Sequence, residues 1–494
     1  VTLAHTLRYT RFLLKLAEAR TEALSLTTIV HRWLEGVLPV FVELSAETTP
    51  MSDRQRREIM DRLGQNFSEY RMAAYNEWPA DQRPLAPDAL NRLLKSASIV
   101  LERSFRSNRR SDGLFHSYNT MELGASVSIQ RLFVMLEGQV AALDAQVLKP
   151  QETVALLDAM YASPLYRADQ HSFLLYPDKI LPDFGQRNSV PADAARAIGA
   201  VRRWEQTSER RILSPDAGDV FRFHADLKNA EVLEERLDAL EQTPDFESID
   251  AEDRTALLKL YERVFNHSAF TGRSSSMYGY EGLGCIYWHM VAKLLLAVQE
   301  SYQRATETKD AFAPQVAAAY DRVRAGFGFN KDPGHYGAFP TDAYSHTPGH
   351  SGAQQPGMTG QVKEQVLTRF GELGVRVEDG SLSFDPSLLY SDELIAKDTD
   401  WSFVGGDGTL STARIPAGGL AFSLAGVPIV YATRARTPSE ERVHIVREDK
   451  TTKTTDGLRL SPDDTRALFG RLGKILRIEV DLLPTRLREK TEGA

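Results

Sequence analysis

The stretch VRVEDGSLSF (Val375–Phe384) marks the point at which the hydrophobic pattern of the chain changes. Two short alternating runs flank Asp379-Gly380, and a dipeptide of this kind between alternating runs is typical of a two-residue hairpin turn. Further along, GGLAFSLAGVPIVYATR and ILRIEVDLL continue the alternation, the latter with apolar residues on one face and charged residues on the other. Residues 373–494 are therefore predicted to form a C-terminal antiparallel β domain.

Ahead of this stretch, apolar residues recur three and four apart in segments separated by Pro, Gly and Asp. This period is typical of amphipathic helices. The clearest helical segments are 90–101, 129–148, 153–160, 232–240, 256–264 and 286–298. Helices followed by a compact β unit do not follow the alternating order of a doubly wound sheet. We therefore predict a mainly α chain with a C-terminal β unit, in which residues 1–372 form a helical domain.

Composition limits the classes of protein to which the chain can belong. It has 494 residues, 42% of them apolar and 26% charged, and its longest apolar runs fall short of the roughly 18 residues of a membrane span. A net charge of −8 with scattered Lys and Arg argues against binding to nucleic acid. Cys285 is the single cysteine, which excludes an internal disulfide and favours a reducing, cytoplasmic location. The first residue is not Met, which is compatible with a piece of a longer chain.

No cofactor or metal is expected from the sequence motifs. GDGT (406–409) lacks the strand, glycine loop and helix of a dinucleotide or P-loop site, and neither HExxH nor GxSxG occurs. The chemistry is therefore expected where polar side chains gather between helices. Four such stretches stand out, namely 167–179, 221–229, 266–284 and 339–364.

The last of these belongs to an unusual loop between Gly326 and Gly360, which holds eight Gly, four Pro and three of the eleven His. Glycine allows backbone N–H groups to approach a ligand, and proline limits the entropy lost when a loop is ordered. Its only acids are Asp332 and Asp342, and a helix is predicted to begin near Thr359. Neutral donors and imidazoles opposite a helix N-terminus suit an anion such as phosphate. We therefore expect the loop to bind an oxyanion together with a sugar.

The residues also allow plainer interpretations. Asp226 and Glu281 stand where a carboxylate commonly caps a helix start. His224 and His289 fit packed, hydrogen-bonded side chains, and Trp288 fits a core residue.

The order of these segments along the chain resembles that of a known enzyme superfamily. The long helical region, the Gly/Gln/Thr-rich loop before a late helix, the text GSLSFDPSLL and the terminal β unit resemble the six-hairpin (α/α)6 glycosidase superfamily, in particular its inverting glycoside phosphorylases. The resemblance covers the order of elements over residues 110–485. YEGLGCIYWHM and FPTDAYSHTPGHSGAQQPGMTGQVKE also resemble C-terminal blocks of long bacterial proteins. The resemblance implies an (α/α)6 toroid followed by a small antiparallel β-sandwich, with residues 1–372 as a helical, barrel-like catalytic domain. It also implies a reaction that cleaves or forms a glycosidic bond of a glucan or disaccharide.

An inverting phosphorylase needs one carboxylic acid and inorganic phosphate as co-substrate, whereas an inverting hydrolase needs a second carboxylate to activate water. The acid-poor loop favours the phosphorylase. By role, Glu281 is the expected general acid, with a pKa raised by partial burial behind Tyr278 and Tyr280, and Asp342 is the second choice. Phosphate or sugar hydroxyls would be bound by Asp169, Gln170, Arg273, Tyr280, His346, Thr347, Gln354, Gln355 and Thr359. Aromatic faces for sugar rings are offered by Tyr280, Trp288, Phe339 and Tyr344.

Three alternatives stay open. One is an inverting glycoside hydrolase of the same fold. Another is a polysaccharide lyase, for which Asn119, His267, Arg273 and Tyr278 could neutralise a uronate and abstract its proton. The third is a non-catalytic carbohydrate-binding segment. The expected partners are an oligosaccharide or polysaccharide, phosphate, and either the remainder of a longer chain or a second copy.

Overall fold

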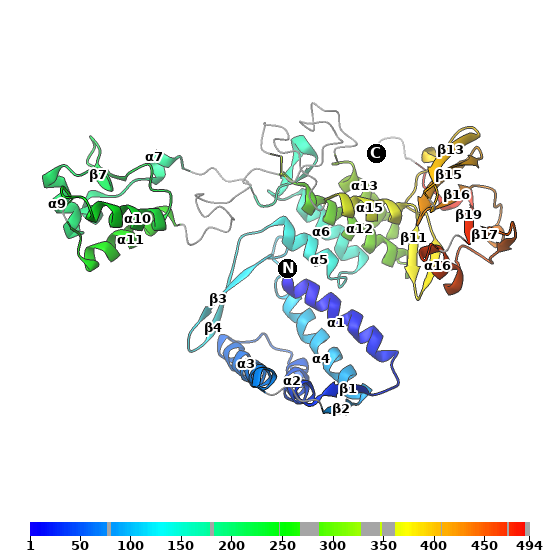
Figure 1. Cartoon of the computed structure of the whole chain (residues 1–494), viewed down its shortest axis with the longest axis horizontal. Helices are drawn as coiled ribbons and strands as arrows, with labels where there is room; N and C mark the ends of the chain where they lie inside the picture. The colour runs from blue at the N-terminus through cyan, green and yellow to red at the C-terminus, as the bar shows by residue number, and fades with distance from the viewer. Residues whose placement is uncertain are drawn as a thin grey trace.

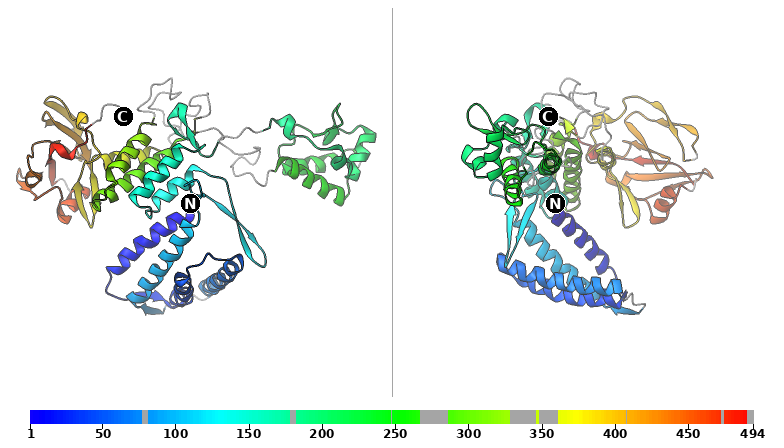
Figure 2. Two further views of the ribbon diagram at one scale, coloured as in Figure 1. Left: turned by 180° about the vertical axis from the view of Figure 1, so that it is seen from behind. Right: turned by 60° about the vertical axis from the view of Figure 1, so that its left-hand side comes forward.

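The computed structural model places helices in the body of the chain and strands at its C-terminal end (Figure 1). It describes residues 1–76, 81–177, 182–246, 248–266, 286–327, 346–347, 361–406, 408–471 and 474–489. Figures 1 and 2 show a helical body, a green unit of residues 182–266 standing apart from it, and the C-terminal strands at the other end. The mainly α chain with a C-terminal β unit is thus confirmed.

The N-terminal part consists of long helices and two small antiparallel strand pairs. Its elements are α1 (Thr2–Glu18), β1 (Leu24–Thr27), α2 (Thr28–Ala46), α3 (Asp53–Asn76), β2 (Gln82–Leu85), α4 (Pro87–Arg106), β3 (Asn119–Leu123) and β4 (Val127–Arg131). Helix α4 packs against α1 and α2, and α2 packs against α3. Strands β3 and β4 form a hairpin beside α3, where Arg57 Nη1 donates to the carbonyl oxygen of Gly124 at 2.8 Å.

The predicted helix over 129–148 is wrong at its start. Ile129 lies in β4, and the helix begins only at α5 (Leu136–Asp144). The reason is local, because Val127 and Ile129 alternate with Ser128 and Gln130 in the period of two that a strand requires. The predicted segment therefore combined the last residues of strand β4 with the helical residues of α5.

The main core surrounds α12. The helices of this body are α5, α6 (Pro150–Tyr161), α12 (Trp288–Glu307), α13 (Ala313–Arg324) and α15 (Gln361–Glu372). Helix α12 contacts α5, α6, α13 and α15, and most of its apolar residues are buried in one cluster. A helix that is covered on several sides is the expected centre of a helical layer. Closure of these helices into a six-hairpin ring stays a prediction.

The unit set apart has a core of its own, built around Trp204, Phe221 and Tyr261. Its elements are α7 (Phe184–Arg187), α8 (Ala192–Arg196), α9 (Gly199–Thr207), β7 (Leu213–Pro215), β8 (Phe221–Phe223), α10 (Ala230–Glu241) and α11 (Ala251–Phe265). The rings of Phe184 and Phe265 stack with centroids 6.0 Å apart. The first and last helices of the unit therefore meet, so that the chain enters and leaves it at one place.

The C-terminal β unit begins with the predicted hairpin. Asp379 and Gly380 both have positive φ, 49° and 75°, between β11 (Val375–Glu378) and β12 (Ser381–Phe384). The following elements are β13 (Thr399–Val404), β14 (Leu410–Ile415), β15 (Gly419–Leu424), β16 (Val427–Ala432), β17 (Arg442–Arg447), β18 (Thr452–Thr454), α16 (Pro462–Phe469) and β19 (Ile475–Asp481).

Five of these strands form one sheet in the order β15-β16-β19-β17-β18. The alternation predicted for ILRIEVDLL is confirmed, since Ile478, Val480 and Leu482 are fully buried. The prediction of purely antiparallel pairing is wrong at one place, because β19 runs parallel to β16. Helix α16 separates β18 from β19 in sequence and allows the chain to return between β16 and β17. A second packed sheet, and hence a sandwich, stays a prediction.

Specific contacts fix the β unit to the helical body. Tyr302 of α12 donates its hydroxyl to the carbonyl oxygen of Ser387 at 3.2 Å, and Arg369 of α15 pairs with Glu393 at 2.8 Å.

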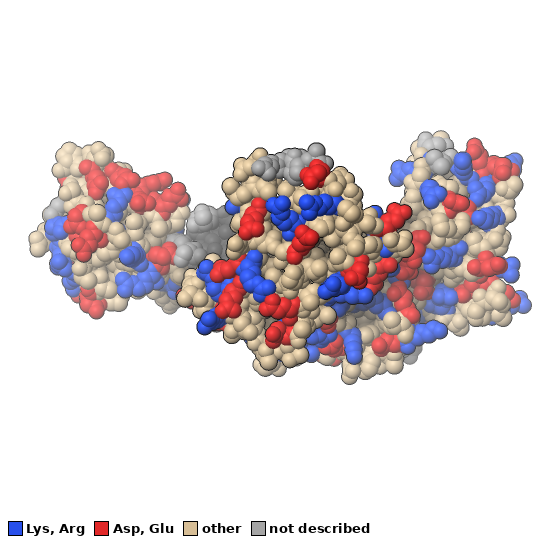
Figure 3. Space-filling model, turned by 90° about the horizontal axis from the view of Figure 1, so that it is seen from below, with Lys and Arg blue, Asp and Glu red and all other residues tan. Residues whose placement is uncertain are grey.

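On the face shown in Figure 3, Lys and Arg are interspersed with Asp and Glu. Among the described residues, no helix combines the length and the apolar character needed to span a bilayer.

Candidate functional site

Two short strands bring distant parts of the chain together at the start of α12. Strand β9 (Ile286–Tyr287) pairs antiparallel with β10 (His346–Thr347), with Tyr287 opposite His346 and Ile286 opposite Thr347. Leu174 forms a further antiparallel bridge to Ile286. We call this place, together with the first turns of α12 and α15, the β9–β10 junction. Segments that lie more than a hundred residues apart in sequence meet there.

The apolar side of the junction is firmly packed. Ile286 and Trp288 are fully buried, and the Trp288 ring lies against Phe327 with centroids 6.0 Å apart. Phe327 is also fully buried and follows the end of α13. The chain is therefore anchored in the main core at the point where it enters α12. Trp288 is a core residue and, being fully buried, does not offer a ring face to a sugar.

On the polar side of the junction, a histidine side chain lies close to a carboxylate. His289 Nε2 in the first turn of α12 lies 3.5 Å from Glu364 Oε1 in the first turn of α15. The side chain of Glu364 is 6% exposed and that of His289 is 19% exposed. A buried carboxylate is costly unless it is paired or hydrogen-bonded, so this contact links the two helix starts.

The loop that carries Asp169 and Gln170 borders the same junction. Strands β5 (Tyr166–Arg167) and β6 (Ser172–Phe173) pair around a 3-10 turn, η1 (Ala168–Gln170), and Leu174 directly follows β6. Asp169 Oδ1 pairs with Arg167 Nε at 2.9 Å and its side chain is half exposed, whereas Gln170 is buried. Of the two predicted binding residues, Asp169 is therefore the accessible one.

Two neighbours fix this loop in place. Gly326, just after α13, approaches so closely that an added Cβ would lie 2.2 Å from the carbonyl oxygen of His171. Tyr161 of α6 packs its ring on Tyr166 and Phe173, with centroids 4.9 and 4.8 Å apart. Burial raises the pKa of Tyr161 to about 12, although the Arg322 guanidinium over its ring acts in the opposite direction. Tyr161 therefore stays protonated at neutral pH.

A cavity of about 400 Å³ has Glu364 among its lining residues. It is also lined by residues of α12, including Lys293 and Glu300, by residues of α1 and α5, and by Val1. Two ion pairs lie among the lining residues, since Arg8 of α1 reaches Glu300 at 2.9 Å and His5 reaches Asp144 at 2.9 Å. The arrangement offers both hydrogen-bond donors and carboxylate acceptors.

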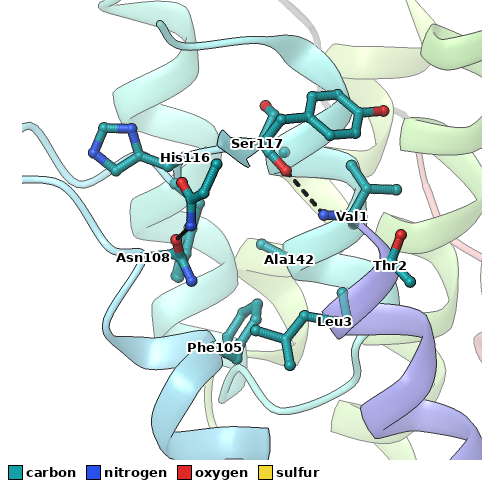
Figure 4. Close-up of a pocket in the computed structure, with 14 residues that line it drawn as sticks. Val1, Thr2, Leu3, Phe105, Asn108, His116, Ser117 and Ala142 are labelled. Carbon is teal, nitrogen blue, oxygen red and sulfur yellow. Dashed lines mark hydrogen bonds between the residues drawn. The ribbon is translucent and has the colours of Figure 1, made fainter. Parts of the chain in front are cut away.

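A smaller cavity of about 220 Å³ lies between α1, α4 and residues 115–119 (Figure 4). The amino group of Val1 donates to the carbonyl oxygen of Ser117 at 2.9 Å. Burial lowers the pKa of His116, whose Nδ1 lies 3.1 Å from the carbonyl oxygen of Leu132. Asn119, a candidate of the lyase alternative, lines this cavity and donates its amide to Asn108 Oδ1 at 2.8 Å.

Most of the predicted site residues lie outside the described residues. These are Glu281, Asp342, Arg273, Tyr280, Gln354, Gln355 and Thr359, together with Tyr278, His267, Phe339 and Tyr344. His346 and Thr347 are described through the backbone of β10, but their side chains are not. Their roles therefore stay predictions.

One expectation on a helix start is revised. Asp226 is not a cap, because α10 is capped by Asn229, whose Oδ1 accepts from the N–H of Val232 at 2.7 Å. Glu364, which lies beside the β9–β10 junction, was not among the predicted residues. Its signal was its position four residues into the late helix that follows the glycine-rich loop, but sequence spacing could not show that it would meet His289.

One comparison with known proteins bears on this arrangement. Residues 181–268 match the family model described as GH149 phosphorylase insertion domain 2. The match covers the α7–α11 unit, and it relates the chain to glycoside phosphorylases, a class of carbohydrate-active enzymes. No curated protein matches the chain. The predicted relation to glycoside phosphorylases is thus supported at this general level. The match does not test the six-hairpin fold, which stays a prediction.

Proposed function

We propose that the chain belongs to an inverting glycoside phosphorylase that acts on a glucan or disaccharide. The observation that carries the proposal is the match of residues 181–268 to an insertion domain of a phosphorylase family. The matched unit is inserted between two parts of the helical body, as its adjoining first and last helices indicate. An insertion domain of this kind implies a host enzyme formed by the residues on both sides.

The β9–β10 junction supports the expected position of the site. Glu281 precedes β9 by five residues in sequence, and Thr359 precedes α15 by two. The described ends of both segments meet, because β9 pairs with β10 and His289 contacts Glu364. This arrangement favours a common site for the proposed acid and the proposed phosphate ligands. Asp169 borders the same junction and is half exposed.

The reaction would need few protein groups. A phosphate oxygen forms a bond to the anomeric carbon while the bond from that carbon to the glycosidic oxygen breaks. Glu281 donates its proton to the leaving oxygen, and phosphate attacks from the opposite face, which inverts the anomeric configuration. Gln354, Gln355, His346 and Thr359 would hold the phosphate, since neutral donors at a helix N-terminus stabilise an anion without adding a competing carboxylate.

The direct test is to incubate the protein with a panel of disaccharides and β-glucans, with and without inorganic phosphate, and to measure sugar 1-phosphate. Phosphate-dependent release of a sugar 1-phosphate with inverted anomeric configuration is expected. Release of free sugar at the same rate without phosphate would favour the hydrolase. An unsaturated product from an acidic glycan without phosphate would favour the lyase, and saturable glycan binding with no product at all would favour the non-catalytic segment.

A further inference from the structure

The segment 484–489, which follows β19, pairs with a loop much earlier in the β unit. The N–H of Arg488 donates to the carbonyl oxygen of Leu389, and the N–H of Ser391 donates to the carbonyl oxygen of Arg488, both at 2.9 Å. These bonds form a short parallel bridge. The segment therefore lies beside the loop at 387–391.

Apolar side chains dock the 387–391 loop on the helical body. Leu388 is 4% exposed and belongs to the core that surrounds α12. Leu389 is fully buried in a separate cluster that also holds Leu373, which follows α15, and Leu487. The loop thus inserts one leucine into the body, and the next leucine is covered in part by Leu487.

One carboxylate of the helical body binds polar groups of both segments. Arg488 donates to both oxygens of Asp321 in α13, from Nη1 to Oδ1 at 3.0 Å. The Arg488 guanidinium also lies 4.7 Å from the centroid of the Tyr390 ring. Burial raises the pKa of Tyr390 to about 12, and a hydrogen bond to Asp321 acts in the same direction. The Tyr390 hydroxyl therefore stays protonated at neutral pH.

The arginine two residues earlier makes its ion pairs within the β unit. Arg486 pairs with Asp385 at 2.9 Å and with Glu441 at 2.6 Å. These pairs hold the start of the segment on the β unit, whereas Arg488 reaches across to the helical body. The segment therefore spans the contact between the two parts.

We infer that residues 484–489 act as a latch, which fastens the 387–391 loop to α13 through Arg488 and Asp321. A bidentate pair between arginine and a carboxylate is stronger than a single neutral hydrogen bond, so it can hold a short segment that has little regular structure. Opening of the latch would uncover Leu389 and leave the five-stranded sheet folded, because that sheet has a core of its own. The latch does not depend on the proposed function.

Helix α13 provides a matched control for Asp321. The next residue, Arg322, donates to Asp158 of α6 at 3.0 Å, so this second pair stays within the helical body. Asp321→Asn and Asp158→Asn each remove the carboxylate of an ion pair made by α13. Only the first change removes a partner of the β unit.

Hydrogen–deuterium exchange of peptides covering 387–391 and 484–489 is the first measurement. Arg488→Gln and Asp321→Asn should each speed exchange there about tenfold, because the amides of both segments are protected by their mutual hydrogen bonds. The double variant should exchange no faster than either single variant, since both changes break one contact. Exchange in β16 and β19 should stay unchanged, and Asp158→Asn should leave the latch peptides as in the wild type.

Limited proteolysis by chymotrypsin is the second measurement. Cleavage after Leu389 or Tyr390 requires local opening of the loop, so it should become about tenfold faster in Arg488→Gln and in Asp321→Asn. Asp158→Asn should be cleaved there at the wild-type rate. If Asp321→Asn does not fold, Arg488→Gln decides by the same two measurements.

Three results would overturn the inference. The first is unchanged exchange or unchanged cleavage at 387–391 in Arg488→Gln. The second is an equal effect of Asp158→Asn on the same peptides. The third is faster exchange throughout the β unit, with β16 and β19 included, because the pair would then stabilise the whole unit and not fasten one segment.

Discussion

At the scale of single residues, the pKa of the Asp464 carboxyl is set by its hydrogen-bond partners more than by its burial. Asp464 is 2% exposed, yet Lys453 and Ser461 both donate to its Oδ2 at 2.6 Å, and Arg447 donates to its other oxygen. Burial acts to raise the pKa of this carboxyl, but the hydrogen bonds outweigh burial and hold the pKa below its ordinary value. Asp464 is therefore ionised in the folded protein at neutral pH.

The stability of Asp464→Asn should depend on pH in a defined way. A carboxyl whose pKa is lower in the folded protein stabilises the fold above its unfolded pKa, and this contribution is lost as the pH falls through the folded pKa. We expect Asp464→Asn to cost about 1–3 kcal/mol at pH 7, with the difference from wild type shrinking below about pH 4. Urea unfolding at a series of pH values measures both quantities. A difference that is constant from pH 7 to pH 3 would contradict the low folded pKa.

Glu281→Gln tests the proposed acid. An amide of the same shape cannot donate the proton, so phosphorolysis should fall by about 10²–10⁴-fold while the melting temperature stays that of the wild type. The measurement is the initial rate of sugar 1-phosphate formation at saturating phosphate. Normal turnover in this variant would move the acid to Asp342, which can be replaced by Asn in the same assay.

At the scale of elements, the entry into the β unit depends on two glycines with positive φ. Gly374 has φ 72° between α15 and β11, and an added Cβ would lie 2.0 Å from the carbonyl carbon of Asp385. Gly380 has φ 75° in the β11–β12 turn, but its nearest neighbour, a side-chain atom of Pro462, would be 4.0 Å from an added Cβ. Both glycines need a left-handed backbone, but only at Gly374 would an added Cβ clash with neighbouring backbone atoms.

This difference predicts unequal costs for the same substitution. Gly380→Ala should destabilise the fold by about 1–2 kcal/mol through the left-handed backbone alone. Gly374→Ala should cost about 1–3 kcal/mol more, because the backbone of Asp385 must also move. The free energies of unfolding of the two variants, compared by denaturant titration, provide the check. Equal losses would mean that the chain around Asp385 relaxes without cost.

Local patterns predicted many elements well. The Asp379-Gly380 turn and the buried face of β19 follow from local turn chemistry and periodicity. The helix predicted over 286–298 is confirmed from Trp288 on, whereas Ile286 and Tyr287 form strand β9. Predictions failed where two periods adjoin, as at Ile129, or where pairing partners are distant in sequence, as for the parallel pair of β16 and β19. A local window contains no information on which strand will lie beside another.

At the scale of the whole molecule, the α7–α11 unit has a core separate from that of the main body. Trp204 is 1% exposed in the first core, and Trp288 is fully buried in the second. Because a core residue stabilises chiefly the cluster that it packs in, truncation of each tryptophan should act on one body.

Trp204→Ala should therefore destabilise the α7–α11 unit by about 3–5 kcal/mol and leave the main body intact. Hydrogen–deuterium exchange should rise in α9, α10 and α11 and stay unchanged in α12 and α13. Trp288→Ala is the matched control and should show the reverse pattern. Faster exchange throughout the chain in Trp204→Ala would show that the two cores unfold as one cooperative body.

The candidate site was predictable only in part. The unusual composition of 339–364 and the polar loop at Asp169 and Gln170 pointed to two segments whose described parts, among them residues 346–347 of the first, lie beside one junction. Sequence reasoning left two readings of Trp288 open, a core residue or a sugar platform, and it could not tell that Gln170 is buried or that Glu364 lies close to His289. Burial and contact depend on which helices pack together, and that choice involves the chain as a whole.

The sequence by itself determined the local order of this protein, namely helices first, then a β unit that begins with a tight turn, because period and turn chemistry act over a few residues. Only the tertiary structure decided that β9 meets β10 and that His289 at the start of α12 lies 3.5 Å from Glu364 at the start of α15. These contacts arise from burying large apolar surfaces around α12, a collective effect that no short stretch of residues encodes.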